Sequence, residues 1–144
     1  MTKPQIWQTK RPNYPFSHIT ETRFADVDLL GHINNVAMAG LFEHGRGMFN
    51  HAIDVERRAP GQRWLIASVT LNYIAECFFP AHVDVASGIS RMGTSSWDIA
   101  SAAFQHGNCV ATCITTLVLT GKEGSTPIPD ALRAEFERLS ISRG

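Results

Sequence analysis

The sequence has 144 residues, of which 44% are hydrophobic and 18% charged, so it can bury a core and is too apolar for a disordered chain. Its formal net charge of +0 gives no overall basic field and argues against a nucleic-acid partner. The polar N-terminus lacks a secretory pattern and no apolar run would span a bilayer, which predicts a soluble cytoplasmic protein without a membrane partner. The three cysteines lack CxxC spacing, so we expect free thiols, no metal site and no cofactor: Cys77, Cys109 and Cys113.

The first elements expected along the chain are an irregular lead-in, a strand and a loop. Residues 1–16 contain three prolines and predict no regular structure. Residues 17–24 alternate polar and less polar side chains, as a strand does. Residues 25–32 are expected to form a loop, because two aspartates and a glycine interrupt the strand pattern.

A long helix is predicted next, beginning at Asn34 or Asn35 and ending near Asn50. Asparagine favours the N-cap because its side-chain oxygen accepts a backbone N–H of the first turn. The segment is rich in small and apolar residues and its only formal charges are Glu43 and Arg46, so the helix should be buried on most sides. Each glycine costs about 1 kcal/mol of helix propensity relative to alanine. We therefore expect another backbone to approach this helix closely.

The rest of the chain is predicted to be mostly strand, with one short helix at the end. Period-two alternation or β-rich composition marks residues 69–73, 83–89, 97–104 and 109–120. Turn-forming residues at 93–96 and 105–108 suggest an antiparallel meander. Asp130 is expected to cap a helix that places Leu132, Phe136 and Leu139 on one face. The order predicts an α+β fold with an antiparallel sheet wrapped around one buried helix.

The strongest functional signal is the run Asp26-Val27-Asp28-Leu29-Leu30-Gly31-His32-Ile33-Asn34-Asn35, directly before the long helix. This run resembles the signature of the 4-hydroxybenzoyl-CoA thioesterase family of hotdog-fold proteins. The resemblance implies a single hotdog domain over residues 1–144 with a core at about 17–139. It also implies hydrolysis of an acyl-CoA or acyl-carrier-protein thioester by a homodimer or dimer-based tetramer, with active sites at the subunit interface.

The chemistry of the run follows from a carboxylate beside a helix start. First-turn N–H groups lack intrahelical partners and carry the positive end of the helix dipole, so they can stabilise negative charge on a thioester oxygen. By resemblance, the donor is the backbone N–H of Asn35. Asp28 would attack the carbonyl carbon as a nucleophile or activate a water as a general base, and the sequence does not choose between these roles. The structural alternative is that Asp28 only caps the helix.

Neighbouring residues in the run have supporting roles. His32 is expected to orient the loop through a hydrogen bond, with contact to the substrate or base catalysis as the alternatives. Gly31 and Asn34 are predicted to border the substrate, with Asn34 also as the N-cap. Asp26 is expected to be structural or to assist. If it lies close to Asp28, like charge would raise one of the two pKa values.

Three further positions are predicted to contact the substrate. Met38 stands where the family often has tyrosine, so the pocket is expected to favour apolar acyl groups over groups that need a phenolic partner. Ser95 and Ser96 are candidates for contact with the pantetheine arm, although hairpin turns also favour serine. Neither serine has the Gly-x-Ser-x-Gly context of a serine hydrolase.

The sequence also allows two other functions and one other catalytic carboxylate. Glu43 on the helix is the runner-up catalytic acid, but it can equally pair with Arg46 at spacing i, i+3. A hotdog dehydratase would need an acid–base pair, for which Asp28 and His32 are the local candidates. A noncatalytic module that binds acyl thioesters or acyl-carrier protein is a third function, because fold alone does not fix activity.

Overall fold

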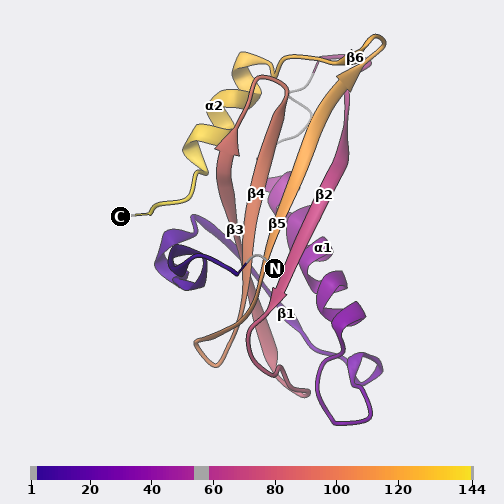
Figure 1. The fold of residues 1–144 in the computed structure, drawn as a ribbon, viewed down its shortest axis with the longest axis vertical. Coiled ribbons are helices and arrows are strands. Elements are labelled where there is room, and N and C mark those ends of the chain that lie inside the picture. The colour runs from indigo at the N-terminus through magenta and orange to yellow at the C-terminus, as the bar shows by residue number, and fades with distance from the viewer. Residues whose placement is uncertain (1–2, 54–58, 144) are drawn as a thin grey trace.

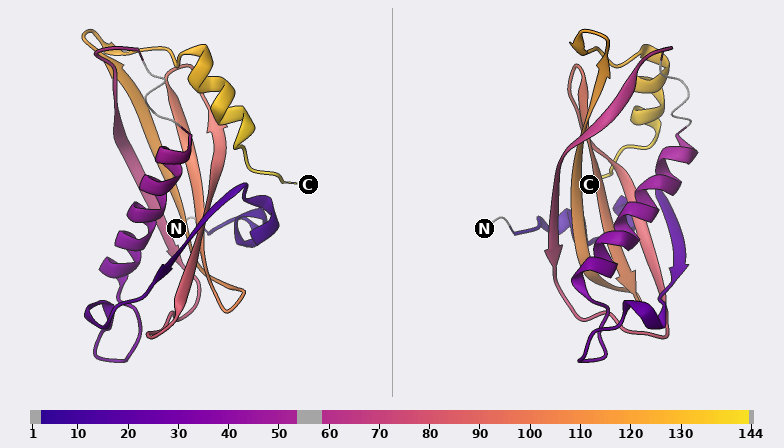
Figure 2. Two further views of the ribbon diagram at one scale, coloured as in Figure 1. Left: turned by 180° about the vertical axis from the view of Figure 1, so that it is seen from behind. Right: turned by 90° about the vertical axis from the view of Figure 1, so that its right-hand side faces the viewer.

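The computed structural model describes residues 3–53 and 59–143. In that part of the chain the strands form one antiparallel sheet in the order β1-β3-β4-β5-β2, with the short β6 beside β5 (Figure 1). The elements are β1 (Phe16–Glu21), α1 (Asn35–Ala52), β2 (Arg63–Tyr73), β3 (His82–Met92), β4 (Ser96–Gln105), β5 (Asn108–Gly121), β6 (Gly124–Ser125) and α2 (Asp130–Arg138). The sheet curves around α1, as the two views of Figure 2 show. This is the expected α+β architecture.

Helix α1 is held against the sheet by one face. Its buried positions include Met38, Phe42 and Phe49, spaced so that they fall on the same side of the helix, and the helix packs on β1, β3 and β4. Burying each of the two phenylalanines is worth about 1.5–3 kcal/mol relative to exposing it. The close approach inferred from the glycines occurs at Gly45, where an added Cβ would lie 2.5 Å from Cγ1 of Val85. The sequence predicts the approach of another backbone, but the neighbour at Gly45 is the Val85 side chain of β3.

Helix α2 closes the end of the sheet that lies beyond the C-terminal end of α1 (Figure 1). Leu132, Phe136 and Leu139 are buried together in a cluster that includes Trp97, which confirms the predicted apolar face. The prediction that Asp130 caps this helix is wrong. Pro129 is the N-cap and Asp130 is the first helical residue, where its charge still complements the helix dipole.

The lead-in is more ordered than its prolines indicate. It forms 3₁₀ helices at Ile6–Thr9 and Arg11–Asn13, and β1 begins at Phe16. Trp7 and Tyr14 pack on the convex face of the sheet against a surface of small side chains that includes Ala86 and Ala102. The strand expected over residues 17–24 ends early, because Phe24–Asp26 forms another 3₁₀ turn.

Strand β2 is an edge of the sheet with most of its residues exposed. Leu65, Val69 and Tyr73 are 50%, 48% and 53% exposed, although all three are large and apolar or aromatic. An uncovered edge of this kind presents unpaired backbone groups and apolar side chains to a partner.

Among the described helices, none is long and apolar enough to cross a membrane.

Candidate active site

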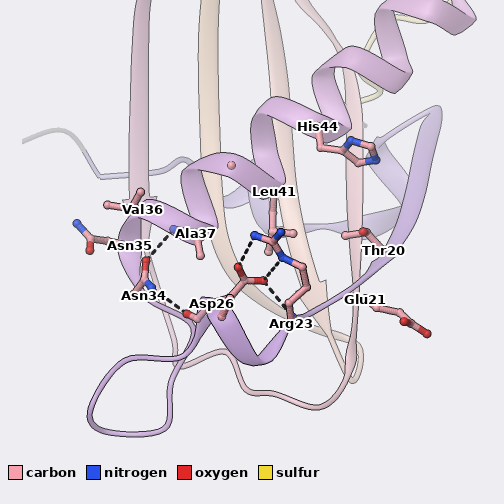
Figure 3. A pocket seen from close by; sticks show the side chains of 12 residues that line it. Thr20, Glu21, Arg23, Asp26, Asn34, Asn35, Val36, Ala37, Leu41 and His44 are labelled. Atoms are coloured by element: carbon pink, nitrogen blue, oxygen red, sulfur yellow. Dashed lines mark hydrogen bonds and ion pairs between the residues drawn. The ribbon is translucent and has the colours of Figure 1, made fainter.

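The start of α1 is fixed by Asn34, as the sequence predicted. The Asn34 side-chain oxygen accepts the N–H of Ala37 at 2.8 Å. Its backbone N–H and its side-chain amide both donate to the carbonyl oxygen of Asp26, at 2.8 Å and 3.0 Å (Figure 3). These bonds close the base of the loop that carries Asp28. The Asn34 side chain accepts the N–H of Ala37 and not the first-turn N–H groups of Asn35 and Val36.

Asp28 is held in a tight turn by its own loop. Its Oδ1 accepts the backbone N–H groups of Leu30 at 2.9 Å and His32 at 3.1 Å. The backbones of Asp28 and His32 are also bonded, N–H to carbonyl oxygen, at 2.8 Å. Gly31 has φ +84°, a conformation that favours glycine. The turn engages Oδ1 of this exposed carboxylate, so Oδ2 is the oxygen that can meet a substrate or a water.

The loop is attached to the segment that follows β2. Ile33 donates its N–H to the carbonyl oxygen of Cys77 at 2.7 Å. Nε2 of His32 lies 3.4 Å from Oε2 of Glu76, and the His32 ring meets the Phe78 ring edge-on at 5.2 Å between centroids. Backbone bonds of His32 hold the loop around Asp28, while its ring contacts Glu76 and Phe78; sequence analysis found neither ring contact.

A cavity of about 380 Å³ brings together Asp28, His32, Asn35 and Met38. Tyr73, a residue that the sequence analysis placed only in a strand, lines the same cavity and donates its hydroxyl to the carbonyl oxygen of Asn35 at 3.2 Å. The alternation over residues 69–73 indicated the strand, but no spacing links Tyr73 to a helix start 38 residues earlier. The cavity therefore contains a phenol although position 38 is methionine.

Met38 and Cys77 form the apolar side of this cavity. Each is 3% exposed, and both belong to the cluster that packs under the start of α1. Burial raises the pKa of the Cys77 thiol, which favours the protonated form and argues against a cysteine nucleophile here. All three cysteines are free in the structure, as expected from their spacing.

Asp26 lies on the other side of the helix start, in a second and larger cavity (Figure 3). Arg23 donates to it through Nη2 at 2.8 Å and through its backbone N–H at 3.0 Å. The Arg23 hydrogen bonds hold the pKa of Asp26 below its usual value. A like charge from Asp28 would raise the pKa of Asp26. The pKa is lowered instead, because Asp26 accepts hydrogen bonds from the Arg23 guanidinium.

Glu43 does not line the cavity that contains Asp28, and it is exposed on α1. The alternative ion pair with Arg46 is not formed within the described residues. Arg46 is buried instead and donates from Nη1 to the Thr115 hydroxyl at 3.2 Å. Arg46 therefore points toward the sheet, where Thr115 of β5 accepts its hydrogen bond, and not toward Glu43 three residues earlier.

Ser95 and Ser96 lie far from Asp28 within this chain. They belong to the hairpin between β3 and β4, beside α2, whereas the loop between β1 and α1 lies at the opposite end of the sheet (Figure 1). The Ser96 hydroxyl accepts a hydrogen bond from Nη2 of Arg91 at 3.1 Å. The structure of one chain thus does not bring the two serines to the cavity that holds Asp28. The described residues also contain no cluster of three or more His, Cys, Asp or Glu side chains that would hold a metal ion.

Comparison with known proteins supplies the family. Residues 22–136 match the model of the thioesterase-like superfamily. None of the curated proteins matches the sequence.

Solved structures share the fold over most of their length. A predicted thioesterase from Bacillus stearothermophilus is 25% identical with a TM-score of 0.79, covering 90% of this chain and 98% of its own. A thioesterase-superfamily protein from Jannaschia sp. CCS1 is 27% identical with a TM-score of 0.76, covering 85% and 81%. A thioesterase from Thermus thermophilus, complexed with coenzyme A and zinc, is 24% identical with a TM-score of 0.78, covering 88% and 95%. The chain therefore has the hotdog fold and belongs to the thioesterase-like superfamily.

Proposed function

We propose that this protein hydrolyses acyl-CoA thioesters, with Asp28 as the catalytic carboxylate. The observation that carries the proposal is the geometry at the start of α1. One oxygen of Asp28 is fixed by two backbone N–H groups, and Asp28 shares a cavity with Asn35, whose N–H lies outside the helix cap. A carboxylate next to uncommitted helix N–H groups suits acyl transfer, in which negative charge develops on the carbonyl oxygen.

The reaction can be written for either role of Asp28. As nucleophile, Oδ2 forms a bond to the thioester carbon, the carbon–sulfur bond breaks, the thiolate leaves, and water then hydrolyses the mixed anhydride. As general base, Asp28 takes a proton from water while the water oxygen attacks, and that proton ends on the leaving sulfur. In both cases the N–H of Asn35 stabilises the oxyanion, and such a donor is typically worth about 2.7–4 kcal/mol.

The choice of a CoA thioester rests on the superfamily, on the resemblance of the Asp28 run to 4-hydroxybenzoyl-CoA thioesterases, and on a Thermus relative of the same fold whose structure contains coenzyme A. Thiol release from a panel of acyl-CoAs tests it. Asp28→Asn should keep the fold, because the amide oxygen can still accept the two N–H groups of the turn. It should lower kcat/KM by much more than tenfold, about 1.4 kcal/mol.

Glu76→Gln is the matched control, because it also neutralises an acid in the same cavity while its amide oxygen can still accept a hydrogen bond from Nε2 of His32. It should retain most of the activity, and Glu43→Gln on the exposed side of α1 should do the same. Asp28→Asn with more than about a tenth of the wild-type kcat/KM would remove Asp28 from the chemistry. Binding of acyl-CoA without thiol release by the wild type would favour the noncatalytic module, and hydration of an enoyl thioester would favour the dehydratase.

Single-turnover kinetics distinguish the two roles of Asp28. A nucleophile releases the thiol before the acid, because an acyl-enzyme intermediate accumulates. A general base releases thiol and acid at the same rate.

We further propose that the active unit is a homodimer, or a tetramer built from dimers, that pairs through β2. The apolar side chains along this edge support the proposal, and the strand ends at Tyr73, which lines the cavity that contains Asp28. Light scattering after size-exclusion chromatography should give a dimer or a tetramer. Val69→Lys places a charge on the exposed edge and should shift the protein toward monomer. A folded, fully active monomer at micromolar concentration would contradict this assembly.

We also infer a cytoplasmic location. Cys77, Cys109 and Cys113 are all free thiols, which suits a reducing compartment.

A further inference from the structure

The lead-in and the tail that follows α2 meet on the convex face of the sheet, opposite α1 (Figure 2). The lead-in packs there on β4 and β5 through its first 3₁₀ helix. The tail runs along β3, where the backbone of Ile89 donates to Leu139 and accepts from Ile141, both at 2.8 Å. We call residues 6–15 and 139–143 together the clasp.

The two segments of the clasp are bonded to each other. The N–H of Ser142 donates to the carbonyl oxygen of Asn13 at 2.9 Å. The guanidinium carbon of Arg143 lies 4.4 Å from the centroid of the Trp7 ring, a distance at which a cation and an aromatic ring attract each other. The lead-in and the tail therefore form one cover and not two independent segments.

The surface under the clasp is apolar and consists mainly of small side chains. Ala86, Ala100 and Ala102 are completely buried, and Phe104 is 5% exposed. Tyr14 of the clasp meets the Phe104 ring edge-on at 6.4 Å between centroids. Without the clasp these residues of β3 and β4 would form an exposed apolar patch, and their small size would let another layer of backbone approach closely.

Outside the clasp the same face of the sheet is polar. Asp98 stands two residues before Ala100 on β4, so both side chains lie on one face. The Asp98 carboxylate accepts a hydrogen bond from Nε of Arg91 at 3.0 Å and from the Thr116 hydroxyl at 2.8 Å. The clasp therefore covers an apolar part of the convex face and leaves a polar part open.

We propose that the clasp occupies a surface that would otherwise bind a second copy of this chain, so that two sheets do not pack back to back and assembly stops at the dimer. A face-to-face contact between two copies needs the same patch on both, and a flat apolar area that spans neighbouring strands provides it. The dimer meant here is the one proposed above through β2. The blocking of the convex face does not depend on that dimer.

Two aromatic residues give a way to open the clasp in the full-length chain. Trp7 packs against the apolar patch, and Tyr14 is 4% exposed with its hydroxyl donating to the carbonyl oxygen of Gln8 at 2.6 Å. Replacing both aromatic residues with alanine removes these contacts. Ile6→Ala is the matched control, because Ile6 lies in the same 3₁₀ helix but is 79% exposed.

Gly88 gives a second and independent way to open the clasp. An added Cβ at this position of β3 would lie 2.6 Å from a side-chain atom of Pro15 and 2.6 Å from one of Ile141. Gly88→Val therefore displaces both segments from the sheet at once, while valine itself suits a strand.

The experiment measures the molar mass by light scattering over a series of protein concentrations, and the exchange of backbone amide hydrogens over residues 6–14. Both open variants should exchange at least about tenfold faster there than the wild type. Both should also form a species of about twice the wild-type mass, more of it at higher concentration. Ile6→Ala should match the wild type in both measurements. Adding Ala102→Lys to an open variant should restore the wild-type mass, because two like charges would then face each other across the contact.

Four results would overturn the inference. The first is faster exchange without a change in mass, and the second is unchanged exchange in both open variants. The third is a doubled mass that persists with Ala102→Lys, which would place the contact on another surface. The fourth is a wild-type tetramer. A wild-type monomer would refute the dimer through β2, whereas a doubled mass in the open variants would still support the role of the clasp.

Discussion

At Gly45 helix α1 packs tightly against Val85 of β3, and replacing this glycine with alanine has two effects of opposite sign on stability. Alanine in a helix interior is favoured over glycine by about 1 kcal/mol. The new Cβ, however, would lie 2.5 Å from Cγ1 and 3.1 Å from Cβ of Val85, where ordinary carbon contacts are about 3.5–4.0 Å. Rotating the Val85 side chain would move Cγ1 but leave its Cβ in place, and Val85 is only 1% exposed. The helix must therefore move away from β3.

Overpacking of this kind costs about 1–3 kcal/mol, so Gly45→Ala should be neutral to destabilising by about 2 kcal/mol after the propensity gain. Gly47→Ala has the same propensity gain without the contact and should be stabilising by up to about 1 kcal/mol. The difference between the two variants isolates the overpacking. At about 3 °C per kcal/mol, it corresponds to roughly 3–9 °C in melting temperature, measured at one protein concentration.

The activity of Gly45→Ala should fall as well, because a displaced α1 moves the N–H of Asn35 relative to Asp28. Adding Val85→Ala to Gly45→Ala removes Cγ1 and should recover part of the stability lost to the contact. Equal stabilisation by Gly45→Ala and Gly47→Ala would show that α1 does not approach β3 as closely as 2.5 Å implies and would refute the reasoning.

Three further changes test individual contacts. Asp26→Asn should cost about 1 kcal/mol at neutral pH, because the Arg23 partner is largely exposed. The pKa of Asp26 is lower in the folded state than the unfolded value of 3.8, so its contribution to stability is complete above pH 3.8 and is lost as the pH falls through the lower folded pKa. The difference in unfolding free energy between wild type and Asp26→Asn, measured with urea, should therefore shrink in acid. Tyr73→Phe should cost at most about 1 kcal/mol of stability but lower kcat/KM by releasing the Asn35 carbonyl, and unchanged kinetics would remove Tyr73 from the site. Met38→Tyr should shift the ratio of kcat/KM among short, long and aromatic acyl-CoAs; a uniform loss with destabilisation of about 1–3 kcal/mol would show that Met38 is ordinary core.

The parts of the site that the sequence predicted are formed by residues close together in the chain. Asn34 caps α1 through a bond to Ala37, three residues later, and the turn at Asp28 closes on His32, four residues later. Short-range geometry of this kind depends on side-chain chemistry and on a few backbone angles, so a pattern of residue types is sufficient to recognise it.

Contacts that depend on the curvature of the sheet could not be predicted in this way. The hydroxyl of Tyr73 reaches Asn35 because the end of β2 passes the start of α1, which is a property of the packed fold. Ser95 is a predicted substrate contact, but within one chain β3, with its 11 residues, separates the β3–β4 hairpin from the other end of the sheet by about 35 Å. A sequence shows that a hairpin exists but not which end of the sheet it occupies relative to the loop that carries Asp28.

The end of β2 and the segment that follows it connect the exposed edge of the sheet to the loop that carries Asp28. Over residues 73–78 this part of the chain contacts the loop and the helix start at four points: the hydroxyl of Tyr73, the carboxylate of Glu76, the carbonyl of Cys77 and the ring of Phe78. The loop itself is mostly exposed, and its other hydrogen bonds, such as those from Asn34 to Asp26 and from His32 to Asp28, lie within the loop. A subunit that pairs with β2 would order this segment and, through it, the turn that presents Asp28. In the proposed dimer, assembly and activity would then be linked even where the partner contributes no reacting group.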